Sequence, residues 1–264
     1  MGAPPREWIL RVLVASAIVA VIATIWSSPA PLALRGLTLL LLAGLLLVQA
    51  FRFIPSFDPL GRIRWRLPAV TGPGRQCAIT FDDGPSAATE AVLDILATEG
   101  VRATFFVLGS NVERFPALVQ RAHAEGHAIG LHGMDHTKLT GAAESAVEAQ
   151  VGGLAALLRR LDISPAPVYR TPHGRKSRSV FRVAARHRLT LWAWTRGVWD
   201  TDKPDPAVLL RRATRAARSG MVLLLHDGRG DEPQPDVTAT VAALPLILRE
   251  LKQRGFTFIR LADV

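Results

Sequence analysis

The sequence predicts a parallel α/β domain that follows two membrane-spanning helices. Two apolar runs lie within the first 54 of the 264 residues. Beyond residue 75, seven short apolar or β-branched runs alternate with segments whose apolar residues recur at helical spacing. Strands that alternate with helices are typical of parallel sheets, so we expect either a barrel or an open sheet.

The two apolar runs cover residues 8–26 and 36–54, and each carries a single arginine near one end. At about 1.5 Å per residue, each run is long enough to cross a hydrocarbon core of ~30 Å. A short turn with two prolines separates them. We therefore expect a transmembrane hairpin in residues 1–55 and a juxtamembrane linker in residues 56–75. The alternatives are a cleaved signal peptide for the first run and a buried hydrophobic hairpin for both runs.

The net charge of the chain is +10, from 32 Lys and Arg against 22 Asp and Glu. Residues 1–75 hold eight of the arginines and two of the acids, a net of +6. Because this excess flanks the apolar runs, it indicates a membrane anchor, and no motif supports a nucleic-acid partner. The arginines lie mainly outside the turn of the hairpin. This predicts a multi-pass protein of the cell membrane with the large C-terminal domain on the cytoplasmic side.

Residues 76–264 are expected to form one domain. Its strands are expected at residues 77–81, 103–108, 127–131, 167–170, 189–194, 221–225 and 256–259. Helical spacing is clearest in residues 147–161 and 237–251, and Pro245 is expected to kink or restart the second helix. Four glycines stand just before strands, where a helix should stop: Gly100, Gly126, Gly220 and Gly255.

Polar side chains follow five of these strands at their carboxyl ends. They are Asp82 and Asp83, His132 and His136, Arg170, Asp200 with Asp202, and His226 with Asp227. Because the carboxyl ends of parallel strands meet at one edge, we expect these side chains to form one site. Cys77 is the only cysteine, which excludes disulfides and sites built on several cysteines. A metal ion would therefore need histidine and carboxylate ligands.

The paired acids and the paired histidines suggest how such a site would work. Asp82 and Asp83 can both reach one site only where the strand turns, and the Gly-Pro that follows supplies a turn. A metal that binds one carboxylate leaves the other free to act on protons. His132 and His136 are spaced i, i+4, as on one side of a helical turn, and with one carboxylate they suit Zn²⁺ or another divalent ion. The alternatives are a helix N-cap acid pair and two surface histidines.

Five segments resemble the polysaccharide deacetylase family, the NodB-homology group of carbohydrate esterase family four. In chain order they are TFDDGP at 80–85, ATFFV at 103–107, His132 with His136, RTPHG at 170–174 and LLLHD at 223–227. The resemblance runs from Gln76 to Leu261. It implies a distorted (β/α) barrel of about seven parallel strands.

The resemblance also implies roles for individual residues. Asp82 would be the general base, His226 the general acid, and Arg170 would position and ion-pair the base. The metal ligands would be Asp83, His132 and His136, holding a divalent ion, in the first place zinc, with cobalt, nickel or manganese as alternatives. The family's usual aspartate–tryptophan signature is missing from residues 194–202, so we assign Asp200 to orient or tune His226.

Substrate contacts are expected from the loops around these residues. Leu224 would line a pocket for the acyl methyl group, and further contacts would come from Pro172, His173, Gly174 and Trp199. His173 fills a position that is often aromatic in the family, and it either contacts substrate or packs. Gly133 stands where the family commonly has Ser or Thr, so an orienting hydroxyl is absent.

The expected function is removal of N-acetyl or similar acyl groups from an amino sugar by a membrane-anchored, metal-dependent hydrolase with a metal-bound water as nucleophile. Alternatives are a deformylase or other non-peptide amide hydrolase on the same fold, and a catalytically inactive carbohydrate-binding membrane protein. Six basic residues in 175–188 and four arginines in 211–218 form two clusters, either solvated helix faces or phosphate sites. With the anchor, they suggest a lipid-linked sugar as substrate and membrane lipid as partner.

Overall fold

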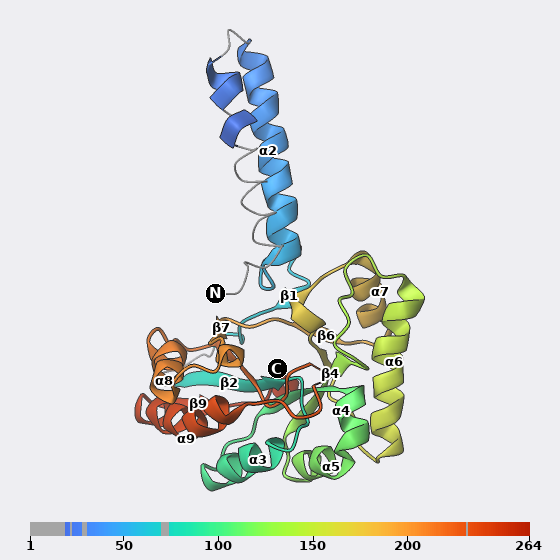
Figure 1. The fold of residues 1–264 in the computed structure, drawn as a ribbon, viewed down its shortest axis with the longest axis vertical. Helices are drawn as coiled ribbons and strands as arrows, with labels where there is room; N and C mark the ends of the chain where they lie inside the picture. Colours follow the sequence, from blue (N-terminus) through green and yellow to red (C-terminus); the bar gives the residue numbers. More distant parts are fainter. Residues whose placement is uncertain (1–18, 22, 28–30, 70–73, 231) are drawn as a thin grey trace. The chain divides into compact units, whose positions relative to one another are not determined.

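The computed structural model describes residues 19–21, 23–27, 31–69, 74–230 and 232–264 (Figure 1). The chain divides into two compact units, Met1–Phe53 and Ile54–Val264. The boundary lies close to residue 55, where the predicted anchor ends.

Helix α2 (Leu32–Phe53) dominates the described part of the first unit. Over Leu32–Ala50 its mean hydropathy is 2.0, and none of that stretch is buried inside the chain. By length and composition, α2 can therefore serve as a membrane anchor or belong to a signal sequence. Most of the first predicted span, residues 8–26, lies outside the described residues, so the hairpin stays a prediction.

The second unit is built on one parallel sheet, which has nine strands among the described residues. They are β1 (Ile63–Arg64), β2 (Arg75–Asp82), β3 (Thr104–Leu108), β4 (Ala128–Gly133), β5 (Val168–Tyr169), β6 (Thr190–Trp192), β7 (Arg196–Gly197), β8 (Met221–His226) and β9 (Phe256–Phe258). The parallel α/β prediction is confirmed, and all seven expected strands are present. The two additional strands, β1 and β7, have two residues each and are too short for an apolar pattern to reveal.

The row of strands curls back on itself. Its order is β1-β6-β5-β4-β3-β2-β8-β7, and β9 pairs with the start of β2. β6 and β7 lie near opposite ends of this row, yet only residues 193–195 separate them in sequence. The segment 190–197 thus pairs with β5 at its beginning and with β8 at its end. This curvature agrees with a distorted barrel and turns the carboxyl ends of the strands toward a common centre.

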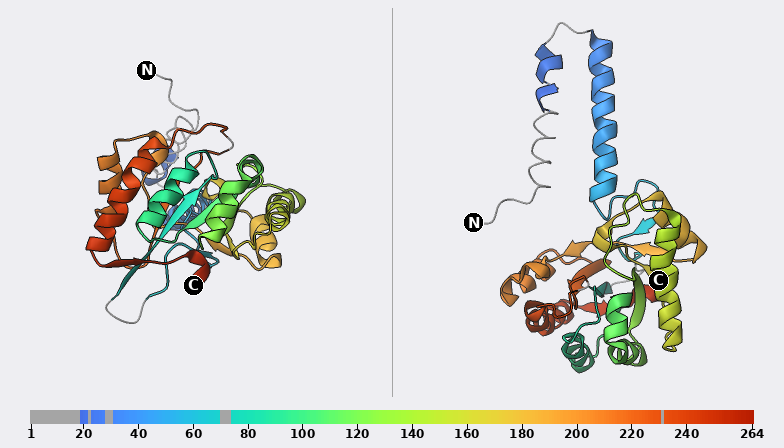
Figure 2. Two further views of the ribbon diagram at one scale, coloured as in Figure 1. Left: turned by 90° about the horizontal axis from the view of Figure 1, so that it is seen from below. Right: turned by 45° about the vertical axis from the view of Figure 1, so that its right-hand side comes forward.

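Seven helices of the second unit lie on the outer side of the curved sheet (Figure 1, Figure 2). They are α3 (Thr89–Thr98), α4 (Gly109–Arg114), α5 (Pro116–Ala124), α6 (Glu144–Arg160), α7 (Arg178–Arg186), α8 (Pro206–Thr214) and α9 (Thr238–Gln253). The helices expected at 147–161 and 237–251 are confirmed as α6 and α9. However, α9 runs through Pro245 without restarting, because Leu244 and Leu248 on either side stay buried against the core. The four predicted helix-stop glycines all have φ between 60° and 86°.

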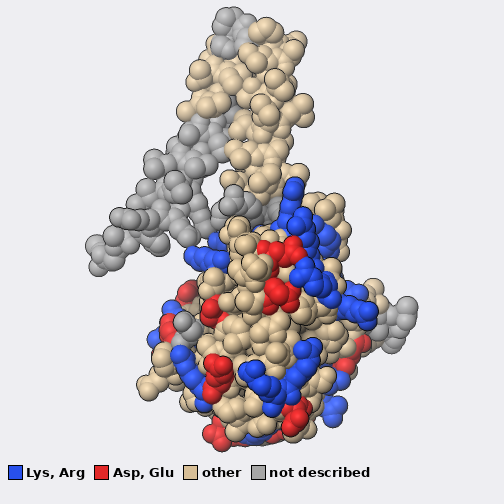
Figure 3. All heavy atoms as spheres, turned by 90° about the vertical axis from the view of Figure 1, so that its right-hand side faces the viewer, with Lys and Arg blue, Asp and Glu red and all other residues tan. Residues whose placement is uncertain are grey.

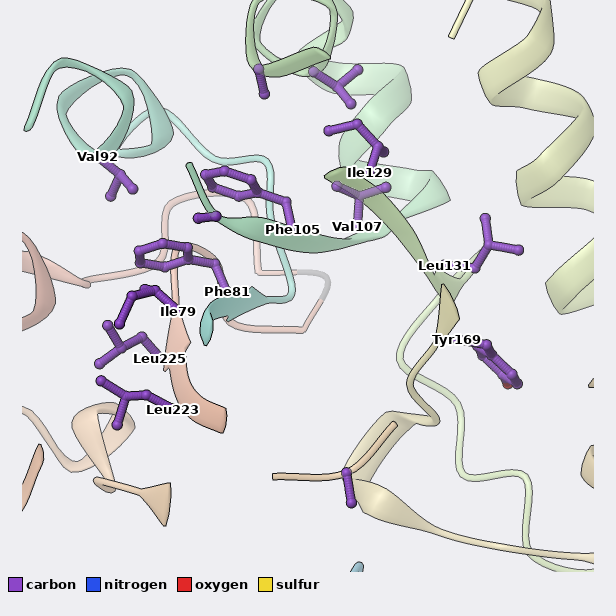
Figure 4. Packing of buried hydrophobic residues seen from close by; sticks show 14 of the residues in the cluster. Ile79, Phe81, Val92, Phe105, Val107, Ile129, Leu131, Tyr169, Leu223 and Leu225 are labelled. Atoms are coloured by element: carbon purple, nitrogen blue, oxygen red, sulfur yellow. The ribbon is translucent and has the colours of Figure 1, made fainter. Parts of the chain in front are cut away.

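Apolar side chains from the central strands fill the space between sheet and helices (Figure 4). The rings of Phe81 on β2 and Phe105 on β3 stack with centroids 5.0 Å apart, and both are essentially inaccessible to water. Burial of such a side chain contributes roughly 1.5–3 kcal/mol. The core therefore fixes the strands whose ends carry the polar residues.

Residues 54–67, predicted to form the end of the anchor and the first part of the linker, pack as part of the second unit. Strand β1 pairs with β6, and the amide of Leu67 donates to the carbonyl of Gly220 at 2.9 Å. The ammonium group of Lys176 donates to three carbonyls of this segment, those of Ile54 (2.7 Å), Pro55 (3.3 Å) and Phe57 (2.6 Å). The segment thus contributes both a strand and packing to the domain.

Candidate active site

The turn at the end of β2 brings two adjacent carboxylates to the same cavity. Asp82 ends the strand, and Asp83 follows with a φ of 70°, which turns the chain where an extended strand would point its carboxylate away. A cis peptide bond joins Gly84 to Pro85. A Cβ on Gly84 would collide with the carboxylate of Asp227, so this position requires glycine.

Asp83, His132 and His136 form a compact cluster. Oδ1 of Asp83 lies 3.2 Å from Nε2 of His132 and 3.2 Å from Nε2 of His136. One ligand atom from each of the three residues lies within 4.8 Å of the others. The helical turn expected for the histidine pair is wrong: His132 lies in β4, and His136 follows the turn after that strand. The strand end and the turn together bring the imidazoles to one carboxylate.

The chemistry of this cluster fits a divalent metal ion. Asp83 is only 4% exposed, and its Oδ1 has no hydrogen-bond partner among the described residues. The amide of Gly230 donates to Oδ2 of Asp83 at 2.8 Å, and Nδ1 of His132 lies 2.6 Å from the carbonyl of Arg170, which orients both side chains. Burial alone would raise the pKa of Asp83, yet its contact with His132 and the charges of the nearby imidazoles hold that pKa below its ordinary value. An ionised carboxylate facing two imidazole nitrogens is a ligand set that zinc and similar ions accept.

Arg170 holds the other carboxylate, Asp82. Its Nη1 donates to Oδ1 of Asp82 at 2.6 Å and to the hydroxyl of Thr80 at 2.8 Å, while Nη2 donates to the carbonyl of Ala193 at 3.0 Å. The guanidinium carbon lies 4.2 Å from the ring centroid of Phe106. Burial lowers the pKa of Arg170 from its ordinary value, but that value is so high that the group stays charged. The charge of Asp82 is thus paired and its carboxylate is fixed in orientation.

His226, at the end of β8, is held by Asp200. Nδ1 of His226 lies 2.9 Å from Oδ1 of Asp200, and the amide of His226 donates to Oδ2 at 2.7 Å. The hydroxyl of Thr240 also donates to Oδ2, at 2.9 Å. Burial disfavours the imidazolium, but the carboxylate of Asp200 outweighs it and raises the pKa of His226 to about 9. His226 is therefore protonated near neutral pH, with its Nε2 free of the Asp200 contact.

These groups face a cavity of about 440 Å³. Eight of the predicted site residues line it: Asp82, Asp83, His132, His136, His173, Gly174, Leu224 and His226. Arg170 and Asp200 are not in the lining and contact Asp82 and His226 instead. The cavity thus combines a metal-ligand cluster, a fixed carboxylate and a protonated imidazole with the apolar side chain of Leu224.

Comparison with known proteins identifies the family. The model of the family described as Polysaccharide deacetylase matches residues 69–192. A peptidoglycan-N-acetylglucosamine deacetylase of Bacillus cereus is 34% identical over 212 residues, which cover 79% of this chain and 95% of that protein. The chain belongs to the polysaccharide deacetylase family. A chitooligosaccharide deacetylase of Bradyrhizobium is 34% identical over 209 residues, covering 76% of this chain and 95% of that protein.

The solved structures agree with this membership. The crystal structure of a peptidoglycan N-acetylglucosamine deacetylase in complex with 4-naphthalen-1-yl-N-oxidanyl-benzamide superposes with a TM-score of 0.71 at 28% identity. The match covers 78% of this chain and 96% of that one. The predicted family is confirmed, and this member is a hydrolase acting on carbon–nitrogen bonds other than peptide bonds.

Only some of the residues predicted to bind substrate line the cavity. The ring of His173 lies 4.1 Å from that of His136, and its Nε2 is 3.3 Å from the carbonyl of His136, so it both packs and lines the cavity. Pro172 is buried, and Trp199 is 66% exposed with the guanidinium of Arg212 5.9 Å from its ring. Neither Pro172 nor Trp199 lines the cavity.

Several residues that line the cavity are not among those predicted from the sequence. Trp194, Arg229 and Glu232 contribute side chains to the cavity wall, and Nε of Arg229 lies 3.5 Å from Oε1 of Glu232. The sequence predicts Trp194 as the end of a strand, and Arg229 and Glu232 follow the LLLHD segment closely, which is the signal that could have found them. Asn111 on α4 donates to the carbonyls of Asp83 (2.7 Å) and Gly230 (2.8 Å), and nothing in its local sequence indicates this.

The basic cluster after the RTPHG segment does not form one open cationic surface. Lys176 is turned inward to backbone carbonyls, as described above. On α7, Arg182 contacts Glu144, and Arg186 contacts both Glu144 and Glu148 of α6. Figure 3 shows acidic side chains among the basic ones on this face. The cluster is therefore partly structural and partly paired, because α6 supplies acids that the local sequence of α7 lacks.

Proposed function

We propose that this family member is a metal-dependent N-deacetylase that removes acetyl groups from an amino sugar of an N-acetylated glycan. The observation that carries the proposal is the convergence of the Asp83–His132–His136 cluster, Asp82 and His226 on one cavity. The relatives named as peptidoglycan-N-acetylglucosamine and chitooligosaccharide deacetylases support this class of substrate.

Asp83, His132 and His136 would hold the metal ion, for which zinc is our first choice and cobalt, nickel or manganese are alternatives. When bound, a divalent ion there would polarise the acyl carbonyl and acidify a water molecule. The hydrogen bonds from the Gly230 amide to Asp83 and between His132 and the Arg170 carbonyl keep two of the ligands in their orientations.

Asp82 would act as the general base. It lies beside the cluster, with its Oδ2 3.9 Å from Nε2 of His132. Arg170 occupies Oδ1, so Oδ2 is the oxygen that can accept the proton of the attacking water. Arg170 acts through Asp82 as a positioning residue, because it is buried behind the carboxylate.

His226 would act as the general acid toward the leaving amine. Its Nδ1 faces Asp200, which leaves the proton on Nε2 for donation. Asp200 is a positioning residue that orients the imidazole and raises its pKa, and Thr240 in turn donates to Asp200 and orients its carboxylate. Leu224, 7% exposed, supplies apolar surface suited to the acyl methyl group.

We also propose that the chain divides into an anchor (1–55), a linker (56–75) whose described residues up to Leu67 pack on the domain, and a catalytic domain (76–264), with a transmembrane hairpin as the anchor. The arginine distribution favours the cytoplasmic side for the catalytic domain. On that side, the deacetylase would meet a lipid-linked glycan and not an assembled extracellular polymer.

The sidedness is tested with a Leu60→Cys variant, because Leu60 is 70% exposed while the natural Cys77 is buried. In intact cells, a membrane-impermeant maleimide should label this variant only after permeabilisation. Labelling of intact cells would place the domain outside. The unsubstituted protein, whose only cysteine is buried, is the matched control.

The activity is tested by acetate release from the purified full chain. The substrates are a lipid-linked acetamido sugar, soluble chitooligosaccharide and peptidoglycan fragments, with a formamido sugar as comparison. We expect acetate release that His132→Ala abolishes. If none of the N-acetylated glycans releases acetate while the formamido sugar releases formate, the proposed reaction is wrong.

A further inference from the structure

Three arginines converge on a second cavity, away from the catalytic groups. This cavity has a volume of about 110 Å³ and is lined by Arg66, Arg196 and Arg218 together with Thr195 and Ser219, among others. Arg66 comes from the segment after β1, Arg196 from β7, and Arg218 from the turn before β8. None of the lining residues is acidic. The cavity shares no residue with the one that holds Asp83 and His226.

These arginines differ from several other surface arginines of the domain, which are paired with acids. Arg121, Arg186 and Arg249 each contact a carboxylate at hydrogen-bond distance. By contrast, no described carboxylate forms an ion pair with Arg66, Arg196 or Arg218. Gathering three like charges without a counterion is unfavourable, and an anion in the cavity would relieve that repulsion.

The walls of the cavity are held in place by hydrogen bonds. Nη2 of Arg66 donates to the carbonyl of Ser219 at 2.7 Å. The amide of Val222 donates to the hydroxyl of Thr195 at 2.8 Å. Gly220 has a φ of 86°, and a Cβ there would meet Nε of Arg66 at 2.9 Å, so glycine lets the guanidinium stem lie close to the backbone. The Arg66 guanidinium is thus held in place, and a group whose position is already fixed loses less entropy when it binds an anion.

The nature of the donors points to a phosphate group. Guanidinium groups bind phosphate oxygens through pairs of parallel hydrogen bonds, and several of them can surround one phosphate. The linker that carries Arg66 favours a lipid as its source. Arg66 follows the end of α2 by 13 residues, and the linker also exposes Leu60 (70%) and Trp65 (43%). Exposed Trp and Leu beside arginines are typical of segments that lie at a membrane interface.

We propose that Arg66, Arg196 and Arg218 bind the headgroup phosphate of an anionic phospholipid. The proposal rests on the inferred membrane anchoring through α2 but not on the deacetylase activity. Arg66 lies in a segment that is attached to the domain through the pairing of β1 with β6 and through Lys176. Lipid bound here would therefore hold the catalytic domain at the membrane surface.

The test uses the full chain in nanodiscs, either of phosphatidylcholine alone or of phosphatidylcholine with phosphatidylglycerol. Hydrogen exchange is followed by mass spectrometry in peptides that cover residues 62–67, 195–198 and 216–222. The test variant carries Arg66→Gln, Arg196→Gln and Arg218→Gln. The matched control removes three exposed arginines outside the cavity, with Arg159→Gln, Arg160→Gln and Arg211→Gln. Circular dichroism and the Tm of each variant report whether it is folded.

We expect exchange in these peptides to slow about tenfold when the anionic lipid exceeds its Kd tenfold, by mass action. The control should keep this protection, and the test variant should lose it. Equal exchange in the two nanodiscs, protection that survives in the test variant, or failure of the full chain to enter nanodiscs would each overturn the proposal. If inorganic phosphate gives the same protection in phosphatidylcholine nanodiscs, the ligand is free phosphate and the lipid is excluded as the source.

Discussion

The active-site edge of the sheet and the basic face of α7 both carry dense charge, but they stabilise it in different ways. Asp82 and Arg170 are 4% and 1% exposed, and each has fixed partners. The side chains of Arg182 and Arg186 are 68% and 54% exposed, and they share the acids of α6. Buried charge is costly to maintain, whereas exposed pairs contribute little. The comparison therefore favours a chemical role for the buried charges at the sheet edge. The exposed charges of α7 instead contribute to its contact with α6.

The largest effect is expected at Asp82. Asp82→Asn keeps the shape of the side chain and a hydrogen bond from Arg170, but it removes the basic oxygen. A general base contributes about 10²–10⁴-fold to rate, so we expect kcat to fall by at least that factor. The Tm should fall as well, because the buried guanidinium of Arg170 loses its counter-charge. Steady-state acetate release checks this result. A rate within twofold of the original enzyme would exclude Asp82 as the base.

Arg170→Met should lower the free energy of unfolding far more than any substitution of an exposed arginine on α7. The substitution leaves Asp82 buried without its partner, and removal of one member of a buried ion pair costs about 3–5 kcal/mol. The free energy of unfolding from urea titration measures this cost. The double variant Arg170→Met with Asp82→Asn should recover part of the loss, because the unpaired charge is gone. No recovery would mean that Arg170 acts mainly through Thr80 and Ala193.

Asp200→Asn should move the pH dependence of the reaction. The folded pKa of His226 is raised from about 6.5 to about 9, chiefly by the Asp200 carboxylate, so the imidazolium persists well above neutral pH. Without that carboxylate the pKa falls, and the alkaline limb of the kcat–pH profile should move to lower pH. The stability from this pair is fully present below pH ~6.5 and is lost as the pH rises through about 9. An unmoved alkaline limb would show that another group sets it.

The smallest effects separate two basic residues that the sequence places in one cluster. Lys176→Met removes a buried ammonium group that binds three carbonyls, and we expect a loss of roughly 1–3 kcal/mol in the free energy of unfolding. Arg186→Gln removes an exposed ion pair and should leave the Tm unchanged within error. Thermal and urea unfolding compare the two. Equal losses of stability in the two variants would mean that the buried Lys176 and the exposed Arg186 contribute alike, which contradicts the distinction between the two regions.

The local sequence predicted which residues gather at the cavity better than it predicted their geometry. Asp83, His132 and His136 could be selected because acids and histidines follow strands whose carboxyl ends must meet. The turn geometry could not be predicted: it depends on the φ of Asp83 and on a His136 that folds back after β4. The partners of the arginines on α7 could not be predicted either, because Glu144 and Glu148 lie on another helix, about 40 residues away in sequence.

The short strands show the same limit. β7 has two residues and pairs with β8, and this pairing joins the two sides of the curled sheet. Two residues carry no periodicity, so only tertiary packing reveals the strand. Trp194, just before β7, belongs to a run that predicts only a buried strand. Its place in the cavity wall likewise depends on tertiary packing.

Metal content tests the central claim most directly, because His136 and His173 form a matched pair. Their rings lie 4.1 Å apart and both line the cavity, but only His136 belongs to the ligand cluster. We expect about one equivalent of divalent metal in the original enzyme and in His173→Ala, and almost none in His136→Ala. Equal metal content in the two variants, or metal lost only from His173→Ala, would contradict the proposed site.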